Sequence, residues 1–199
     1  MPIRFGSYNI SNERNRGLDS AQGMSQANMD LGIFQKAKCT EGIYTRESAR
    51  YRVITTDAPS QHRGGVALFY RPSPLFAVEA VRQFGPNVMS FQLATGVRQW
   101  YIIGCYLALD DTFTIESVVS ALKERPKGTT LVVAGDLNTA LDDPENNRRG
   151  MEIAAALIEA GLEDMMAHFL LRRRRLEGSD GCGAWSGRAR SSGHGHTKF

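Results

Sequence analysis

The segment Leu131–Asn138 (LVVAGDLN) constrains the fold more than any other part of the chain. Its apolar start contains two valines and predicts a buried β-strand. A glycine, a carboxylate and an amide follow, and Asp136 and Asn138 share one face if the strand continues. A carboxylate suits Mg²⁺ or an activated water, and an amide can hydrogen-bond a phosphate oxygen. An ordinary polar turn at a strand end is an equally open interpretation of this segment alone.

The apolar pattern along the chain predicts an α+β domain. Short apolar segments predict strands over residues 3–10, 29–34, 51–55, 66–70, 88–93 and 100–107. Helical spacing follows at residues 114–125 and 151–159, and the polar segment 11–23 is either a loop or the start of a helix. Many strands followed by a helix, a strand and a helix favour packed sheets with helices outside.

The length of 199 residues predicts one domain, over residues 1–171, followed by a basic tail, residues 172–199. The tail holds seven Lys/Arg against two Asp/Glu, whereas the whole chain has a net charge of +3. Its richness in Gly, Ser and Arg predicts disorder. The three widely spaced cysteines favour a reduced, intracellular setting. We expect no membrane segment, because no apolar run is long enough to cross a bilayer.

Polar side chains end several of the predicted strands. Asn9 lies at the end of the first predicted strand, Gln35 ends the second, and Tyr106 lies near the end of a later one. We expect these strand ends to converge on one cleft together with Asp136. For Tyr106 a place in the core is as reasonable as a functional role.

Five motifs with fitting order and spacing resemble the endonuclease/exonuclease/phosphatase superfamily. More narrowly, they resemble the endonuclease domain of non-LTR retrotransposon reverse transcriptase polyproteins. The motifs are Tyr8-Asn9-Ile10, 30–38 (DLGIFQKAK), 63–70 (RGGVALFY), 104–109 (GCYLAL) and 135–138 (GDLN). The resemblance covers about residues 3–170.

The resemblance implies a four-layer α/β sandwich, incomplete at the C-terminus, that hydrolyses a DNA phosphodiester with Mg²⁺ or Mn²⁺. Metal would be bound by Asn9 and Asp136, and Asp136 would also activate the attacking water. Tyr106 would hydrogen-bond the phosphate or the leaving oxygen, and Asn138 would hold a phosphate oxygen. DNA contacts are expected from three arginines: Arg63, Arg172 and Arg173. A downstream reverse transcriptase domain and a nuclear location are further implications.

Two departures from the family pattern favour a degenerate enzyme. Gln35-Lys36-Ala37 stands where the family has Gln-Glu-Thr, so Lys36 replaces the main metal-binding glutamate. An ammonium a few ångströms from the metal would weaken metal binding by roughly several kcal/mol at an intermediate effective dielectric. The family's closing Asp and Asp-His strand has no counterpart in residues 178–199, which suggests truncation or a frameshift. Weak or absent activity is therefore expected, and the alternatives are a non-catalytic nucleic-acid-binding remnant or an enzyme acting on small phosphoesters.

Overall fold

The computed structural model describes residues 2–10, 17–38, 45–48, 50–58, 64–108, 113–138 and 148–161. All of them lie in one compact unit, Met1–Leu162. A second unit, Glu163–Phe199, lies outside the described residues. The predicted domain boundary at residue 171 and the predicted disordered tail lie there too.

Nine strands form two mixed sheets within the described part of the chain. The first sheet has the order β1-β2-β5-β4-β3, and the second has the order β6-β7-β8-β9. The strands of the first sheet are β1 (Phe5–Asn9), β2 (Leu31–Gln35), β3 (Thr45–Ser48), β4 (Tyr51–Thr55) and β5 (Val66–Tyr70). Those of the second are β6 (Phe76–Gly85), β7 (Val88–Thr95), β8 (Gln99–Tyr106) and β9 (Thr130–Asp136). The pairs β1·β2 and β8·β9 are parallel, so each pair brings two carboxyl ends to the same edge.

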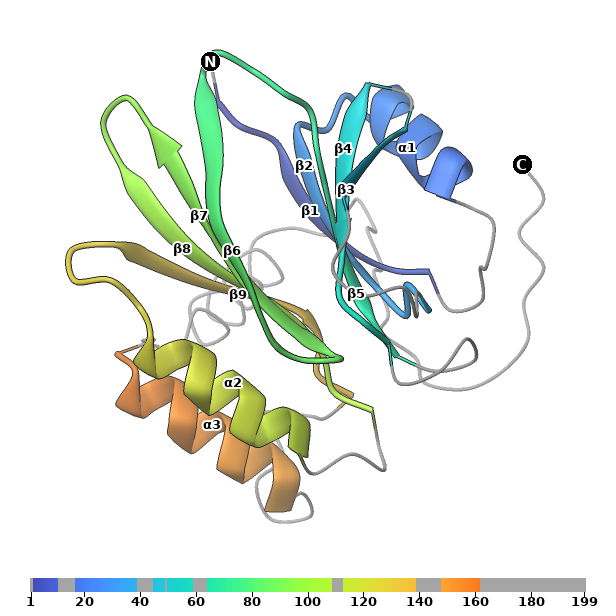
Figure 1. The fold of residues 1–199 in the computed structure, drawn as a ribbon. Coiled ribbons are helices and arrows are strands. Elements are labelled where there is room, and N and C mark those ends of the chain that lie inside the picture. The colour runs from blue at the N-terminus through green and yellow to red at the C-terminus, as the bar shows by residue number, and fades with distance from the viewer. Residues whose placement is uncertain are drawn as a thin grey trace, which may run out of the picture. The chain divides into compact units, whose positions relative to one another are not determined.

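Helices cover the outer faces of both sheets, which gives the four-layer α/β sandwich that was expected (Figure 1). Helix α1 (Gly17–Gln26) packs Ala21 and Met24 against the outer side of the first sheet. Helices α2 (Phe113–Lys123) and α3 (Arg148–Glu159) cover the outer side of the second sheet. The helical spacing predicted at 114–125 is therefore confirmed, and the buried face of α2 includes Val118 and Leu122.

The main core lies between the two sheets and follows the alternation of each strand. Leu31 and Ile33 of β2 point into it, as does Ile102 of β8. Gly104 allows the sheets to approach, because an added Cβ would lie 3.0 Å from a methyl carbon of Ile33. A side chain there would require the neighbouring Ile33 side chain to move.

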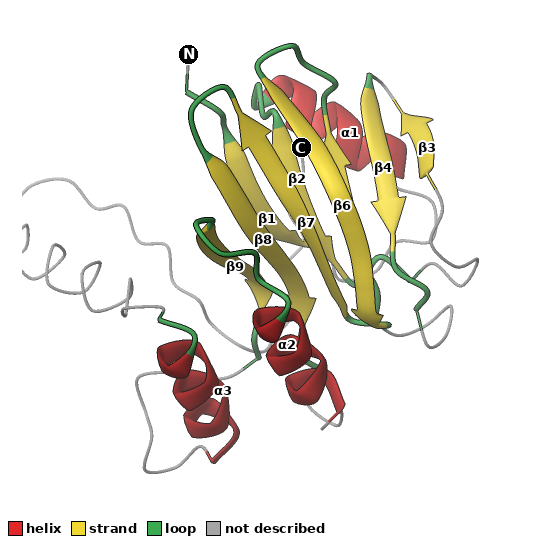
Figure 2. Ribbon diagram, turned by 60° about the vertical axis from the view of Figure 1, so that its left-hand side comes forward, coloured by secondary structure: helices red, strands yellow, loops and turns green. Residues whose placement is uncertain are grey.

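Two strands were not predicted from the sequence, and one was predicted with the wrong burial. Both β3 and β6 border their sheets, and β6 is ten residues long with a register shift between Glu79 and Arg82 (Figure 2). Strand β9 was expected to be buried, but of its residues Leu131 alone is classed as buried. The reason is that, among the described strands, β9 pairs with β8 alone and forms an edge.

Candidate active site

Four strand ends bring polar side chains together at one end of the space between the sheets. The residues are Asn9, Gln35, Tyr106 and Asp136, and together they form the strand-end cluster. Asn9 is paired in register with Gln35, and Tyr106 with Asp136. The two pairs are joined across the sheets, because the Asn9 side-chain amide donates a hydrogen bond to Oδ2 of Asp136.

Strand alternation explains why these side chains face inward. Val132 and Ala134 of β9 pack against the core between the sheets, and Asp136 is the next residue of that series. Tyr106 belongs to the inward series of β8 that includes Ile102. The cluster is therefore a polar continuation of the apolar core.

Both carboxylate oxygens of Asp136 accept hydrogen bonds. Oδ2 accepts from the Asn9 side chain, and Oδ1 accepts from the backbone N–H of Asn138 at 3.1 Å. Gly135 holds this corner close to β8, since an added Cβ would lie 1.9 Å from the carbonyl oxygen of Cys105. The GDLN sequence thus delivers an oriented carboxylate.

The structure corrects the expectation that Asn138 continues the strand on the same side as Asp136. Strand β9 ends at Asp136, and Asn138 has a left-handed backbone with φ of 45°. Its backbone N–H bonds back to the Asp136 side chain, which closes a turn two residues long. The Asn138 side-chain amide donates to the carbonyl oxygen of Leu107 at 2.8 Å, so this group ties the two strand ends together.

Gln35 is a cluster member that the sequence analysis left without a role. Its side chain is 1% exposed, and Nε2 donates to Ser7 Oγ at 2.9 Å. The hydrogen bond fixes β1 against β2 immediately before Asn9. A buried glutamine at the end of an otherwise apolar strand is the sequence signal for this role.

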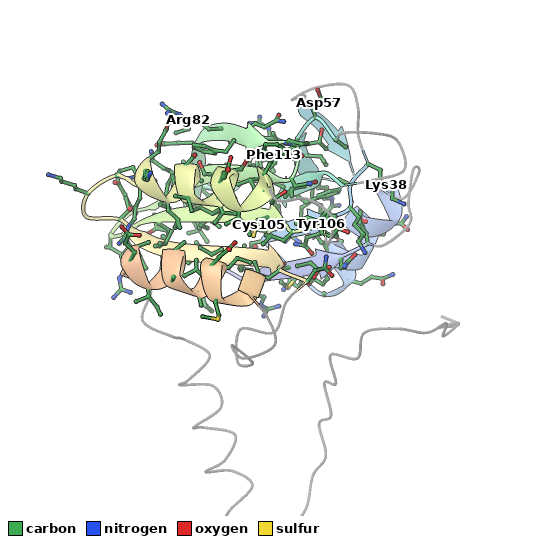
Figure 3. The ribbon with its side chains drawn as sticks, turned by 90° about the horizontal axis from the view of Figure 1, so that it is seen from below. Lys38, Asp57, Arg82, Cys105, Tyr106 and Phe113 are labelled. Atoms are coloured by element: carbon green, nitrogen blue, oxygen red, sulfur yellow. The ribbon has the colours of Figure 1, made fainter. Side chains whose placement is uncertain are left out.

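Lys36 follows β2 and reaches the cluster through its ammonium group, which lies 5.3 Å from the centre of the Tyr106 ring. Tyr106 lies at the end of β8 and directly follows Cys105, whose side chain packs on the opposite face of the sheet (Figure 3). The backbone of Lys36 is left-handed, with φ of 61°. The next two N–H groups hold this bend, because Ala37 donates to Gly65 and Lys38 donates to Gly64.

Asn87 supports both sides of this arrangement and was not predicted. Its Oδ1 accepts from the N–H of Gly65 at 2.9 Å, and its carbonyl oxygen accepts from the N–H of Tyr106 at 2.9 Å. The side chain is 3% exposed. One buried residue thus links the loop that holds Lys36 to the strand end that carries Tyr106.

Cys105 takes no part in the chemistry of the cluster. Burial first, and then the negative charge of Asp136, raise the pKa of the Cys105 thiol to about 12. The thiolate, which is the reactive form, is therefore scarce at neutral pH.

The described residues do not fit the expected divalent metal site. Within the described ranges, no three His, Cys, Asp or Glu side chains lie close enough to hold a metal ion. Asp136 is the one carboxylate of the strand-end cluster, and Lys36 adds a positive charge over the Tyr106 ring. Arg63, Arg172 and Arg173 lie outside the described residues.

The fold and the cluster belong to a known class of protein. The profile of the Endonuclease/Exonuclease/phosphatase family matches residues 6–197, so the chain belongs to this family. The match confirms the resemblance carried by the five motifs, and it extends past residue 170 into the basic tail.

Solved structures with the same fold include nucleases and a phosphatase. The endonuclease domain of TRAS1, a telomere-specific non-LTR retrotransposon, has a TM-score of 0.63 and 19% identity, with 82% of this chain and 74% of that chain covered. The 3′ phosphatase NExo from Neisseria, bound to a product DNA hairpin, has a TM-score of 0.58 and 16% identity, with 82% of this chain and 73% of that chain covered. An AP endonuclease from Archaeoglobus fulgidus has a TM-score of 0.52 and 15% identity, with 80% of this chain and 70% of that chain covered. At these identities the likeness establishes the fold.

No curated protein sequence matches the chain. A search of the helices in the described ranges finds none that is long and apolar enough to cross a membrane.

Proposed function

We propose that the chain is a DNA endonuclease-type domain of retrotransposon origin whose metal-dependent phosphodiester hydrolysis is weak or absent. The observation that carries the proposal is the composition of the strand-end cluster, which holds a single carboxylate, Asp136, and whose Tyr106 ring lies 5.3 Å from the ammonium of Lys36. The family and the fold of the TRAS1 endonuclease domain support the phosphodiesterase ancestry. Within that fold, an ammonium over the Tyr106 ring of the cluster opposes a divalent cation there electrostatically.

The residues present can still perform part of a hydrolytic reaction. Asp136 can orient or deprotonate an attacking water, and the Asn9 amide and the Tyr106 hydroxyl can donate to phosphate oxygens. Asn138 stabilises the turn that orients Asp136 and is assigned a positioning role rather than direct phosphate contact. Mg²⁺ or Mn²⁺, if bound, would supply charge neutralisation, for which Asn9 and Asp136 are the available oxygen donors.

A plasmid-nicking assay tests the proposal. The purified full chain is incubated with supercoiled plasmid and Mg²⁺ or Mn²⁺, and the open-circular product is measured over time. We expect little product above the Asp136→Asn variant, which keeps the shape of the side chain and removes its charge. Lys36→Glu alone is expected to give less than full activity. Rapid nicking by the unchanged chain, lost in Asp136→Asn, would refute a degenerate site.

A non-catalytic nucleic-acid-binding remnant is the alternative function. The feature that favours it is the basic tail, residues 172–199, with seven Lys/Arg. Its binding would weaken steeply with salt, because phosphate contacts release counterions. DNA affinity measured at several salt concentrations, with and without residues 172–199, tests this role. Binding that is absent, or insensitive to salt and to the deletion, would contradict it.

The retrotransposon origin also carries proposals about context. A reverse transcriptase domain would follow this one in the intact polyprotein, and the protein would act in the nucleus. An open reading frame for a reverse transcriptase downstream of the coding sequence is the expected finding.

A further inference from the structure

We infer that Lys36 and Tyr106 form an oxyanion site that binds a phosphate group without a divalent metal. The inference rests on the proposed function, because it places the phosphate at the strand-end cluster. It goes further by assigning the positive charge of that site to a side chain of the chain itself. The ligand class is a phosphomonoester, a phosphodiester or free phosphate.

The charge of Lys36 is not neutralised by a partner within the described residues. Among the described residues its ammonium contacts the face of the Tyr106 ring, and 5.3 Å separate Nζ from the ring centre. A ring face attracts a cation without removing its charge, and the attraction is weaker than that of a nearby anion. A phosphate can therefore take over the ammonium at little cost.

Among the described residues Asp136 forms no ion pair with Lys36, and the hydrogen bonds of its carboxylate are made with Asn9 and Asn138. Oδ1 accepts from the N–H of Asn138, and Oδ2 accepts from the side chain of Asn9. The carboxylate is thereby kept in the cluster as a hydrogen-bond acceptor, and the ammonium stays directed at the ring.

The backbone places Lys36 before any ligand arrives. Its left-handed φ of 61° is held on the following residues by hydrogen bonds from Ala37 to Gly65 and from Lys38 to Gly64. Asn87 fixes Gly65 and Tyr106 at once. The backbones that carry the Lys36 and Tyr106 side chains are consequently linked through one buried residue, Asn87, which lowers the cost of ordering this part of the chain on binding.

The Tyr106 hydroxyl supplies a second donor. Within the described residues no hydrogen bond of this hydroxyl is recorded, and the side chain is half-buried at the mouth of the space between the sheets. An ammonium and a phenol together can contact two oxygens of one phosphate. This pair would replace the metal as the group that faces the negative charge.

Metal-free binding of inorganic phosphate tests the inference. The full chain, labelled with ¹⁵N, is titrated with inorganic phosphate at constant ionic strength, first with EDTA and then with Mg²⁺. We expect the backbone amide chemical shifts of Lys36, Ala37 and Tyr106 to change with phosphate concentration and to saturate in EDTA. The affinity for phosphate should be the same in EDTA and in Mg²⁺ within about twofold. Saturation that requires Mg²⁺ would overturn the inference, and this measurement needs no variant.

Two variants with the same change of charge identify the residue responsible. Lys36→Gln is expected to weaken phosphate binding in EDTA about tenfold, as one charge-assisted hydrogen bond is lost. Lys127→Gln is the matched control, because Lys127 is exposed and lies before the start of β9. Asp136 is at the other end of this seven-residue strand. Equal affinities for Lys36→Gln and the unchanged chain would overturn the inference, as would equal losses in both variants.

The phosphate titration and the plasmid assay fail independently. If the chain neither nicks DNA nor binds phosphate in EDTA, the proposed function stands and this inference is wrong. A chain that nicks rapidly and needs Mg²⁺ to bind phosphate rejects both.

Discussion

Replacing Asn87 with alanine should destabilise the fold and loosen the candidate site together. The substitution removes the Oδ1 acceptor from the N–H of Gly65, a hydrogen bond of 2.9 Å in a buried position. It also removes a longer contact of 3.5 Å, from the Asn87 amide to Thr114 Oγ1. The carbonyl oxygen of Asn87 still accepts from Tyr106, because that bond is made by the backbone.

The expected loss follows from the group left without a partner. A buried N–H that loses its acceptor costs about 1–3 kcal/mol, and Asn87 is 3% exposed. The contact to Thr114 lies at the limit of hydrogen-bond length and adds little. We therefore expect the free energy of unfolding to fall by about 2 kcal/mol. Thr114→Val removes the contact to the Asn87 amide but keeps the acceptor of the Gly65 N–H, and it should cost less than Asn87→Ala.

Urea unfolding and amide hydrogen exchange test the two halves of this prediction. Unfolding gives the stability of each variant, and exchange reports on the N–H of Lys38, whose acceptor is Gly64. Faster exchange at Lys38 in Asn87→Ala, but not in Thr114→Val, is the expected pattern. A stability change below about 0.5 kcal/mol, with unchanged exchange, would refute the role given to Asn87.

Three further substitutions have defined outcomes. Gly135→Ala should lower the free energy of unfolding by about 3 kcal/mol, because its Cβ would lie 1.9 Å from a carbonyl oxygen, whereas Gly96→Ala, with nothing within 4 Å, should be nearly neutral in the same urea assay. Tyr51→Phe should cost about 1–3 kcal/mol, since the buried hydroxyl accepts from Arg71 at 2.9 Å, and a melting temperature equal to that of the unchanged chain would contradict this. The pKa of the Cys105 thiol, about 12 in the fold against 9.0 as its ordinary value, means that the unfolded chain releases this proton first as the pH rises. The stability that this group contributes is thus fully present below pH 9 and is lost towards pH 12. Between pH 7 and pH 10 the free energy of unfolding of the unchanged chain should fall by about 1.4 kcal/mol more than that of Cys105→Ala. Free energies of unfolding that change in parallel with pH in the two proteins would count against this prediction.

Segments with strong local patterns were predictable from the sequence. The predicted strands at 51–55 and 66–70 coincide with β4 and β5, which are mostly apolar and lie inside the first sheet. Strands β3 and β6 lie at sheet edges, where solvent on one side permits charged residues such as Glu79. The alternation of β6 is also interrupted near Ala80, whose φ is 48°. The pattern of β3 and β6 is therefore weaker than that of β4 and β5, whereas the edge strand β9 keeps an apolar pattern that was predictable.

The candidate site was predictable where it depends on strand ends and not where it depends on turns. Parallel strands end at a common edge, which pairs Asn9 with Gln35 in one sheet and Tyr106 with Asp136 in the other, and the packing of the two sheets brings Asn9 to Asp136. Asn138 was misplaced because its side chain follows a left-handed turn that periodicity does not describe. Asn87 was missed because its partners, Gly65 and Tyr106, are distant in the sequence.

The inward alternation of β1, β2, β8 and β9 makes the strand-end cluster sensitive to parity. A single residue inserted within β9 would turn Asp136 away from Asn9 and toward the layer of α2 and α3. An insertion of two residues would restore the inward direction of the carboxylate while lengthening the strand. Length variation in these strands is therefore tolerated by the site in steps of two, even where the hydrophobic layers would accept other changes.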